Sequence, residues 1–175
     1  MNDPLRLVVE VPEEAMAADA STSFEEFFDR ERVELSRTLC LVTRNRHEAE
    51  ELAQDAFVRV LERWDRVSAM DDPRGYLYRT AMNAFRSRYR RALLTAKRTL
   101  GVTRPDDAIA AVDDRDAAVR ALAPLSPRQR AAVVLIDLLG YTSEEAARML
   151  GIRASTVRMH TSRAHAALKE TMRHE

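Results

Sequence analysis

Apolar residues recur at every third or fourth position over most of the chain, and this period indicates amphipathic helices. The first periodic stretch covers residues 23–42 and opens with Ser23 and Glu26, which have the spacing of a capping box. A second stretch covers residues 45–64. A third covers residues 72–98 and starts with an aspartate N-cap before a proline in the first turn. Together these stretches predict an N-terminal helical bundle.

The helical period is absent from two parts of the chain. Residues 1–20 show no sustained repeat, so we expect them to form a mobile N-terminal extension. Residues 99–115 contain a glycine, a proline and two pairs of aspartates, which predict a flexible acidic linker. The linker divides the chain into an N-terminal domain at residues 21–98 and a C-terminal domain at residues 116–175. The expected fold class is all-α, with two small helical domains.

The C-terminal domain has the pattern of a helix-turn-helix. Thr142 and Glu145 have capping-box spacing at the start of a short helix, and Ala147 is small enough for a close helix crossing. Gly151 permits the positive φ of a tight turn, and Val157 can pack the following helix onto the first. Two helices joined in this way place the second one where it can enter the major groove of DNA.

The second helix of this motif presents a polar face with almost no acid. Arginine bonds guanine in fork geometry, and a methionine thioether can touch a thymine methyl group. A solvated amphipathic helix is the alternative explanation for such a face, but the turn pattern favours DNA binding. The predicted DNA contacts are Thr156, Arg158, Met159, Ser162 and Arg163.

Charge is distributed unevenly, although the formal net charge is zero. Residues 73–105 contain no acidic residue, and on a helix Arg79, Asn83, Arg86 and Arg90 align opposite the apolar face. Such a row suits a phosphate backbone, and an amide within it can read a base edge. A solvated face is the alternative, but it normally mixes both signs of charge.

Two further features of the N-terminal domain remain open. Trp64, Tyr76 and Tyr78 lie around the start of the third helix and suit stacking of unpaired bases, although core packing is the commoner role for each. The helix at residues 45–64 has an acidic outer side. This side is either a solvated face or a docking face for a basic partner, and composition does not choose between them.

No catalytic or metal site is predicted. The four histidines lack the spacing of metal-binding motifs, and neither a glycine-rich phosphate loop nor a nucleophile elbow occurs. Cys40 is the only cysteine, so neither a disulfide within the chain nor a cysteine zinc cluster is expected. We expect no cofactor. A cytoplasmic protein without membrane insertion is predicted, because no signal peptide and no apolar run of ~20 residues is found.

Four segments resemble parts of the extracytoplasmic-function sigma factors, small members of the sigma-70 family. RHEAEELAQDAFVRVL at residues 46–61 and DPRGYLYRTAMNAFRSR at residues 72–88 resemble their domain 2. LSPRQRA at residues 125–131 and TVRMHTSRA at residues 156–164 resemble their domain 4. The order of the segments is the same as in the family, although Gly75 is unusual near the start of its helix.

The resemblance implies an RNA polymerase sigma factor that has no enzymatic activity. Domain 2 would melt and read the −10 promoter element through Arg79, Asn83 and Arg86, with one base flipped into a protein pocket. Domain 4 would read the −35 element in duplex form and contact the polymerase β flap. A face of the second helix would dock on the β′ clamp helices of core polymerase, and its expected contacts are Glu48, Glu51, Leu52, Gln54, Asp55 and Val58.

The resemblance also implies roles for the linker and for an inhibitory partner. The acidic linker would mimic RNA inside the polymerase channel, and a simple soluble tether is the alternative. Its residues span at most ~55 Å when extended, which is comparable with one to two turns of duplex. An anti-sigma protein is an expected partner.

Two other functions are weighed against this one. A helix-turn-helix regulator of another family would bind its operator without polymerase and would not need the basic row on the third helix. A scaffold protein that binds only proteins would also not need that row, so alanine at Arg79 and Asn83 would leave it active.

Overall fold

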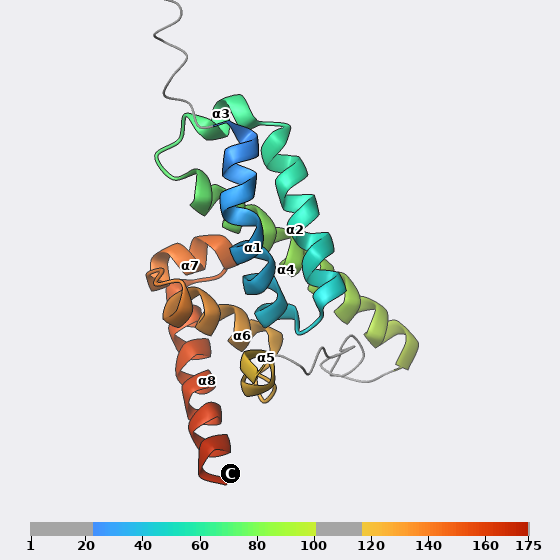
Figure 1. Ribbon diagram of the computed structural model, residues 1–175. Helices are drawn as coiled ribbons and strands as arrows, with labels where there is room; N and C mark the ends of the chain where they lie inside the picture. The colour runs from blue at the N-terminus through green and yellow to red at the C-terminus, as the bar shows by residue number, and fades with distance from the viewer. Residues whose placement is uncertain (1–22, 101–116, 175) are drawn as a thin grey trace, which may run out of the picture.

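The computed structural model describes residues 23–100 and 117–174, and these residues form helices without any β-strand (Figure 1). The N-terminal module, residues 23–100, contains α1 (Phe24–Thr43), α2 (Arg46–Leu61), α3 (Trp64–Ser68) and α4 (Pro73–Leu100). The C-terminal module, residues 117–174, contains α5 (Ala117–Ala121), α6 (Pro127–Val133), the π-helical turn η2 (Val134–Leu138), α7 (Ser143–Leu150) and α8 (Ala154–His174). The predicted all-α class is confirmed. The predicted extension and most of the predicted linker lie outside the described residues.

The helix starts follow the local capping signals. Ser23 with Glu26 and Thr142 with Glu145 form the two predicted capping boxes, and in each the side chain and backbone N–H bond reciprocally. Ser126 with Gln129 forms a third capping box at the start of α6. These bonds satisfy backbone donors that have no partner within the first turn of a helix.

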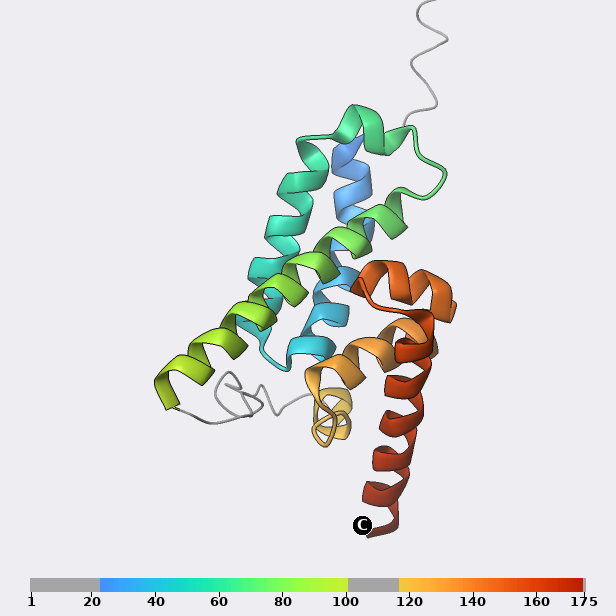
Figure 2. The same cartoon turned by 180° about the vertical axis from the view of Figure 1, so that it is seen from behind.

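The N-terminal module is a bundle in which α1 packs against α2 and α4 crosses α2 (Figure 1; Figure 2 shows α4 from the other side). Its core is built from the predicted apolar faces, since Leu35, Leu39, Val60 and Leu77 are fully buried. Phe28 lies outside this core and is 37% exposed.

The segment before α4 contains a short helix. Residues 64–68 form α3, which is anchored by the buried side chain of Val67. Trp64 packs edge-on against Phe24, with ring centroids 5.5 Å apart, and Tyr78 is fully buried. Tyr78 therefore belongs to the core of the bundle, whereas Trp64 and Tyr76 are both half-buried and pack against that core.

Gly75 has a local explanation in the N-cap of α4. The Asp72 carboxylate accepts a hydrogen bond from the Gly75 N–H at 2.8 Å. A Cβ atom at residue 75 would lie 1.9 Å from the second carboxylate oxygen of Asp72. A side chain at residue 75 would therefore force the capping carboxylate of Asp72 to shift.

The C-terminal module contains the predicted helix-turn-helix in α7 and α8. Gly151 ends α7 with φ +60°. Val157, in the first turn of α8, is fully buried in the hydrophobic core. The helix before α7 is not α-helical throughout, because residues 134–138 form a π-helical turn. In this turn the Leu139 N–H donates to the Val134 carbonyl at 3.0 Å, and Gly140 then leaves the helix with φ +72°.

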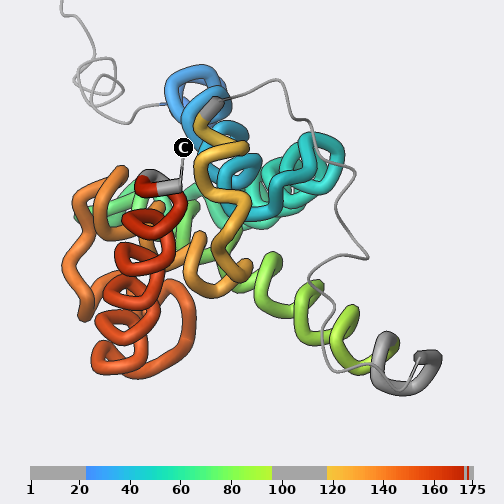
Figure 3. Tube along the Cα trace, turned by 90° about the horizontal axis from the view of Figure 1, so that it is seen from below, coloured from blue at the N-terminus to red at the C-terminus, as the bar shows by residue number. Residues whose placement is uncertain are grey.

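The two modules pack against each other. Helix α4 contacts α7, and α1 contacts α6. Buried residues of both modules, such as Leu39 and Leu135, belong to one hydrophobic cluster. The C-terminal half of α4 projects away from this shared core (Figure 3), so the middle of α4 is the part that meets the C-terminal module.

Candidate DNA-binding and polymerase-binding surfaces

One exposed face of α4 carries the predicted basic row. Its four members, named the basic stripe from here on, are Arg79, Asn83, Arg86 and Arg90, and all are exposed. Leu77, Ala81 and Phe85 are buried on the opposite side of the same helix, which fixes the direction of the stripe. The residues that periodicity aligned are therefore on one accessible surface.

Tyr76 extends this surface toward the start of α4. The Arg79 guanidinium carbon lies 5.2 Å from the centre of the Tyr76 ring, and the Arg63 Nη1 donates to the Tyr76 hydroxyl at 3.3 Å. A partly exposed aromatic ring between two arginines combines a stacking platform with positive charge. This combination suits unpaired nucleotides.

One member of the stripe has a protein partner. The Arg86 Nη1 donates to the Leu150 carbonyl at 2.7 Å, although Leu150 is in the C-terminal module. Nearby on α4, Arg88 pairs with Glu51 at 2.7 Å. Arg88 thus forms an ion pair within the N-terminal module, and Arg86 contacts the helix-turn-helix in this structure.

Helix α8 presents the second predicted set on an exposed face. Arg158, Met159, Ser162 and Arg163 are exposed, whereas Thr156 is half-buried at the start of the helix. The Arg158 Nη1 lies 3.1 Å from a Glu144 carboxylate oxygen. Because both side chains of this pair are exposed, it stabilises the fold by only ~0–1 kcal/mol and does not block the surface.

His160 lies beside this face and is half-buried. Burial lowers the pKa of its imidazole below the ordinary value of 6.5, and the charges of Arg128 and Arg163 lower it further. His160 is therefore biased toward its neutral form, because protonation would place a third positive charge beside two arginines.

The predicted docking face of α2 is only partly accessible. Gln54, Asp55 and Val58 are exposed, with 55% of Val58 accessible. The prediction that Leu52 contacts the polymerase is corrected here, because Leu52 is 1% exposed and faces the core of the bundle. It supports the face from below and cannot contact a partner directly.

The two glutamates of that face have different environments. Glu51 accepts a hydrogen bond from Arg88 at 2.7 Å, and this bond holds the pKa of Glu51 below its usual value. Burial raises the pKa of Glu48, against the opposing charge of Arg88. Helix α4 and the acidic face of α2 are therefore joined by the Arg88–Glu51 ion pair, which lies outside the stripe.

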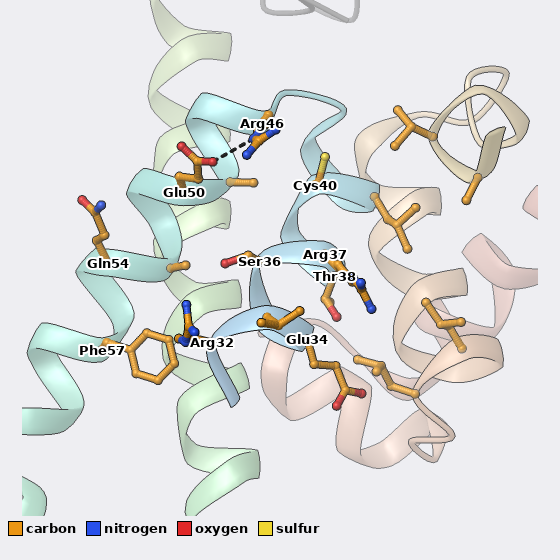
Figure 4. A pocket seen from close by; sticks show the side chains of 18 of the residues that line it. Arg32, Glu34, Ser36, Arg37, Thr38, Cys40, Arg46, Glu50, Gln54 and Phe57 are labelled. Carbon is orange, nitrogen blue, oxygen red and sulfur yellow. Dashed lines mark hydrogen bonds and ion pairs between the residues drawn. The ribbon is translucent and has the colours of Figure 1, made fainter. Parts of the chain in front are cut away.

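A groove that was not predicted from the sequence runs along the outer side of α1 (Figure 4). Its volume is about 1040 Å³. Apolar lining comes from α1 and α2 and, in the C-terminal module, from Ala118, Val119, Leu138 and Leu139. Charged lining comes from four arginines and two glutamates. The apolar side chains include Phe28, Val33, Cys40, Leu41, Ala53 and Phe57, and the arginines are Arg30, Arg32, Arg37 and Arg46. The sequence signal that could have predicted this groove is the pair Phe28 and Val33, two large apolar residues outside the core face of α1.

Residues 23–100 and 117–174 contain neither a cluster of metal ligands nor a helix that could span a membrane. No group of three or more histidine, cysteine, aspartate or glutamate side chains in these ranges is placed to hold a metal ion. No helix among the same residues is long and apolar enough to cross a membrane.

Models of two protein families match the chain in the order expected from the sequence. The model described as Sigma-70 region 2 matches residues 27–93, which covers most of the N-terminal module. The model described as Sigma-70, region 4 matches residues 115–168, which includes α7 and most of α8. The basic stripe and the exposed face of α8 thus fall in different regions of the same family.

Comparison with individual proteins gives the same family. The chain is 34% identical over 152 residues to the ECF RNA polymerase sigma factor SigM of Mycobacterium tuberculosis, covering 83% of this chain and 75% of SigM. It is 31% identical over 159 residues to the RNA polymerase sigma-E factor of Streptomyces avermitilis, covering 90% and 89% of the two chains.

Two solved structures have a similar fold. The sigma factor RpoE of Bartonella quintana, solved with the anti-sigma factor NepR, aligns with a TM-score of 0.66 and 24% identity over 86% of this chain and 96% of that one. CnrH, solved with the cytosolic domain of CnrY, aligns with a TM-score of 0.57 and 22% identity over 93% and 95% of the two chains. The chain belongs to the extracytoplasmic-function sigma factors of the sigma-70 family, and it directs promoter-specific transcription initiation by RNA polymerase.

Proposed function

We propose that the basic stripe of α4 melts and reads the −10 promoter element, while α8 reads the −35 element as duplex. On α4, Arg79 and Asn83 would contact bases or phosphates, and Tyr76 would stack on an unpaired base. On α8, Arg158, Ser162 and Arg163 would contact base edges in the major groove.

The observation that carries this proposal is the stripe itself. Arg79, Asn83 and Arg90 are exposed on one helix face, and residues 73–105 supply no acid to neutralise them. A surface of this kind attracts phosphate by counterion release and places one amide among the cations for base reading. The exposed face of α8 supplies a second contact on the same DNA.

Core polymerase would bind through α2. Gln54, Asp55 and Val58 form an accessible face that suits the β′ clamp helices, with Glu48 and Glu51 at its margin. The C-terminal module would contact the β flap. The chain would act without a catalytic centre or cofactor of its own, and it would work in the cytoplasm with the polymerase.

An anti-sigma protein is the proposed inhibitor. The groove on α1 suits an amphipathic helix, because its floor is apolar and its rim is rich in arginine. A partner helix with an apolar stripe and flanking acids would match both features. Glutamate at Val33 would weaken such a complex, and this change lies far from the basic stripe along the sequence.

Reconstituted transcription tests the proposal. The purified chain and core polymerase would be incubated with genomic DNA, and the start sites would be mapped. On a promoter found in this way, Arg79→Ala with Asn83→Ala should reduce promoter opening by about tenfold or more, because each base contact contributes ~1–3 kcal/mol. Arg32→Ala on α1 is the matched control, since it removes an exposed arginine outside the stripe.

The rival functions give different results in the same assays. A regulator that works alone would bind duplex DNA specifically without core polymerase in a gel shift. A protein-binding scaffold would be unaffected by alanine at Arg79 and Asn83. Either result would refute the proposed roles of α4 and α8.

A further inference from the structure

Exposed apolar side chains gather in the groove on α1. Of the seven large apolar side chains that are exposed within residues 23–100 and 117–174, three line this groove. Val33 is 47% exposed, Leu138 is 60% exposed, and the Phe28 ring lies 4.8 Å from the Phe57 ring, centre to centre. Apolar side chains that cluster on a surface mark a binding site. The groove therefore presents an apolar floor that a bound segment would cover.

The rim of the groove carries positive charge that is not fully neutralised. Three of its four arginines pair with a carboxylate of their own helix, as Arg46 does with Glu50 at 2.9 Å (Figure 4). The second lining glutamate, Glu34, pairs at 2.6 Å with Arg74, which is outside the lining. Arg37 is exposed and forms no ion pair with any other residue in the two described ranges. The rim therefore favours an acidic occupant.

The part of the chain that precedes α1 has the complementary composition. Residues 1–22 lie outside the described residues, and their sequence contains five carboxylates but only one basic residue, Arg6. An apolar run lies among the acids. The apolar residues of the run are Leu5, Leu7, Val8, Val9 and Val11, and the acids that flank or interrupt it are Asp3, Glu10, Glu13 and Glu14. One short stretch thus matches both the floor and the rim of the groove.

This stretch is also close enough to reach the groove. Residues 1–22 end at Ser23, the N-cap of α1, and the groove begins at Phe28 in the second turn of that helix. The lining of α1 from Phe28 to Leu41 is ~20 Å long at the helical rise per residue. Residues 12–22 span at most ~40 Å when extended. A segment tethered this closely has a millimolar effective concentration at the groove, which favours it over a free partner.

We propose that residues 5–14 of the chain bind in the groove on α1. The apolar run covers Val33 and Leu138, and the glutamates that follow it lie near Arg37. Any other occupant of the groove has to displace this segment first. The inhibitor proposed above would therefore meet a competitor within the chain itself, and this consequence alone rests on the proposed function.

Photocrosslinking of the full chain identifies the occupant. A benzophenone amino acid in place of Val33 reacts with C–H bonds that touch it, and mass spectrometry locates the crosslinked residues. The sample is an equal mixture of light and heavy isotope-labelled chains, so that crosslinks between two copies give light–heavy pairs. We expect crosslinks from residue 33 to residues 5–14 within one copy.

Val58 is the matched control position, because it is 55% exposed on α2 but does not line the groove. The same amino acid in place of Val58 should give a yield at residues 5–14 that is at least about tenfold lower, since the tether alone brings no specific contact. Equal yields at the two positions would overturn the proposal. Light–heavy pairs from residue 33 would place a second copy in the groove and would also overturn it.

Substitutions in the segment test what holds it. Leu7→Asp with Val9→Asp should lower the yield from residue 33 about tenfold, because two apolar contacts are lost. Ala17→Asp with Ala18→Asp is the matched control, since it adds the same charge to residues 1–22 outside the proposed contact. Equal losses in the two double variants would overturn the proposed seating of the apolar run.

A charge reversal in the groove tests the rim separately. Arg37→Glu should lower the yield about threefold, because it places a like charge beside the glutamates of the segment. Arg59→Glu on α2 is the control, since Arg59 is exposed outside the groove lining and its reversal should leave the yield unchanged. An unchanged yield in Arg37→Glu would contradict the electrostatic part of the proposal.

These yields are measured without polymerase, promoter DNA or inhibitor. A chain that gives the expected crosslinks but directs no initiation would contradict the proposed function and leave the occupant of the groove in place. A chain that directs initiation but gives no crosslink from residue 33 to residues 5–14 would overturn the occupant alone.

Discussion

Helices α4 and α8 carry the two proposed DNA surfaces, and their arginines differ in what they contact without DNA. Arg158 of α8 pairs with Glu144 of the same helix-turn-helix, and both side chains are exposed. Arg86 of α4 bonds the backbone of the other module. Releasing the α8 surface requires the loss of one weak ion pair, worth ~0–1 kcal/mol. Releasing Arg86 requires the loss of a hydrogen bond from a charged donor, worth ~1.5–3 kcal/mol.

This difference indicates where control over promoter binding is located. The face of α8 is exposed in this structure, whereas Arg86 in the stripe of α4 bonds the other module. The surface proposed to open DNA is thus the one that contacts the other module. Three changes test this contrast, beginning with the largest expected effect.

Alanine at Gly151 should break the bond of Arg86 to Leu150, because its Cβ atom would collide with the Arg86 guanidinium. We expect Gly151→Ala to lower the free energy of unfolding by ~2–3 kcal/mol, through the strained φ and the lost bond of Arg86 to Leu150. Gly140→Ala is the matched control, because residue 140 also has a positive φ but nothing lies within 4 Å of its Cβ position. Gly140→Ala should lower the free energy of unfolding by only ~1 kcal/mol.

Urea unfolding of both variants, each with and without Arg86→Ala, provides the measurement. The excess cost of Gly151→Ala over Gly140→Ala should disappear when Arg86 is absent. If the excess persists without Arg86, the contact between that arginine and the turn has no energetic role.

Alanine at Arg158 should weaken the −35 contact without changing the modules' arrangement. We expect holoenzyme affinity for a duplex −35 fragment to fall about tenfold, because one base or phosphate contact is lost. Glu144→Ala should raise that affinity about twofold, since it releases Arg158 and removes a negative charge from the interface. A gain in affinity from Arg158→Ala would contradict the proposed role of α8.

His160→Gln should have the smallest effect of the three changes. It should alter how the stability of the fold depends on pH. The pKa of His160 is lowered in the folded chain, so the unfolded chain binds more protons below the ordinary value of 6.5. The associated stability is present above that value and is lost as the pH falls toward the folded pKa. His160→Gln should reduce this loss by about 0.5 kcal/mol or less.

Thermal unfolding of both chains between about pH 8 and about pH 5 checks the sign of this effect. Helix α4 has no histidine, so only the α8 surface is expected to respond in this range. A steeper loss of stability at low pH in the variant would contradict the assignment.

Much of the fold was predictable from the sequence because its signals are local. The capping box at Ser23, the proline start of α4 and Gly151 in the turn each depend on residues a few positions apart. The direction of the basic stripe was predictable for the same reason, since helical periodicity sets which residues oppose Leu77.

Contacts between the modules were not predictable in this way. Arg86 and Leu150 are 64 residues apart, and nothing in the sequence near either one indicates the other. Periodicity shows that a helix has an apolar face but not which element covers it. Leu52 illustrates the same limit, because membership of a family motif does not distinguish a buried support from an exposed contact.

Cys40 gives the groove on α1 a chemical reporter. It lines the groove and is the only cysteine of the chain, so a thiol reagent modifies one defined position in the unaltered protein. A helix seated in the groove would shield this sulfur and slow its alkylation. Mass spectrometry of the labelled fraction would therefore follow occupancy of the groove in a mixture with polymerase, DNA or an inhibitor.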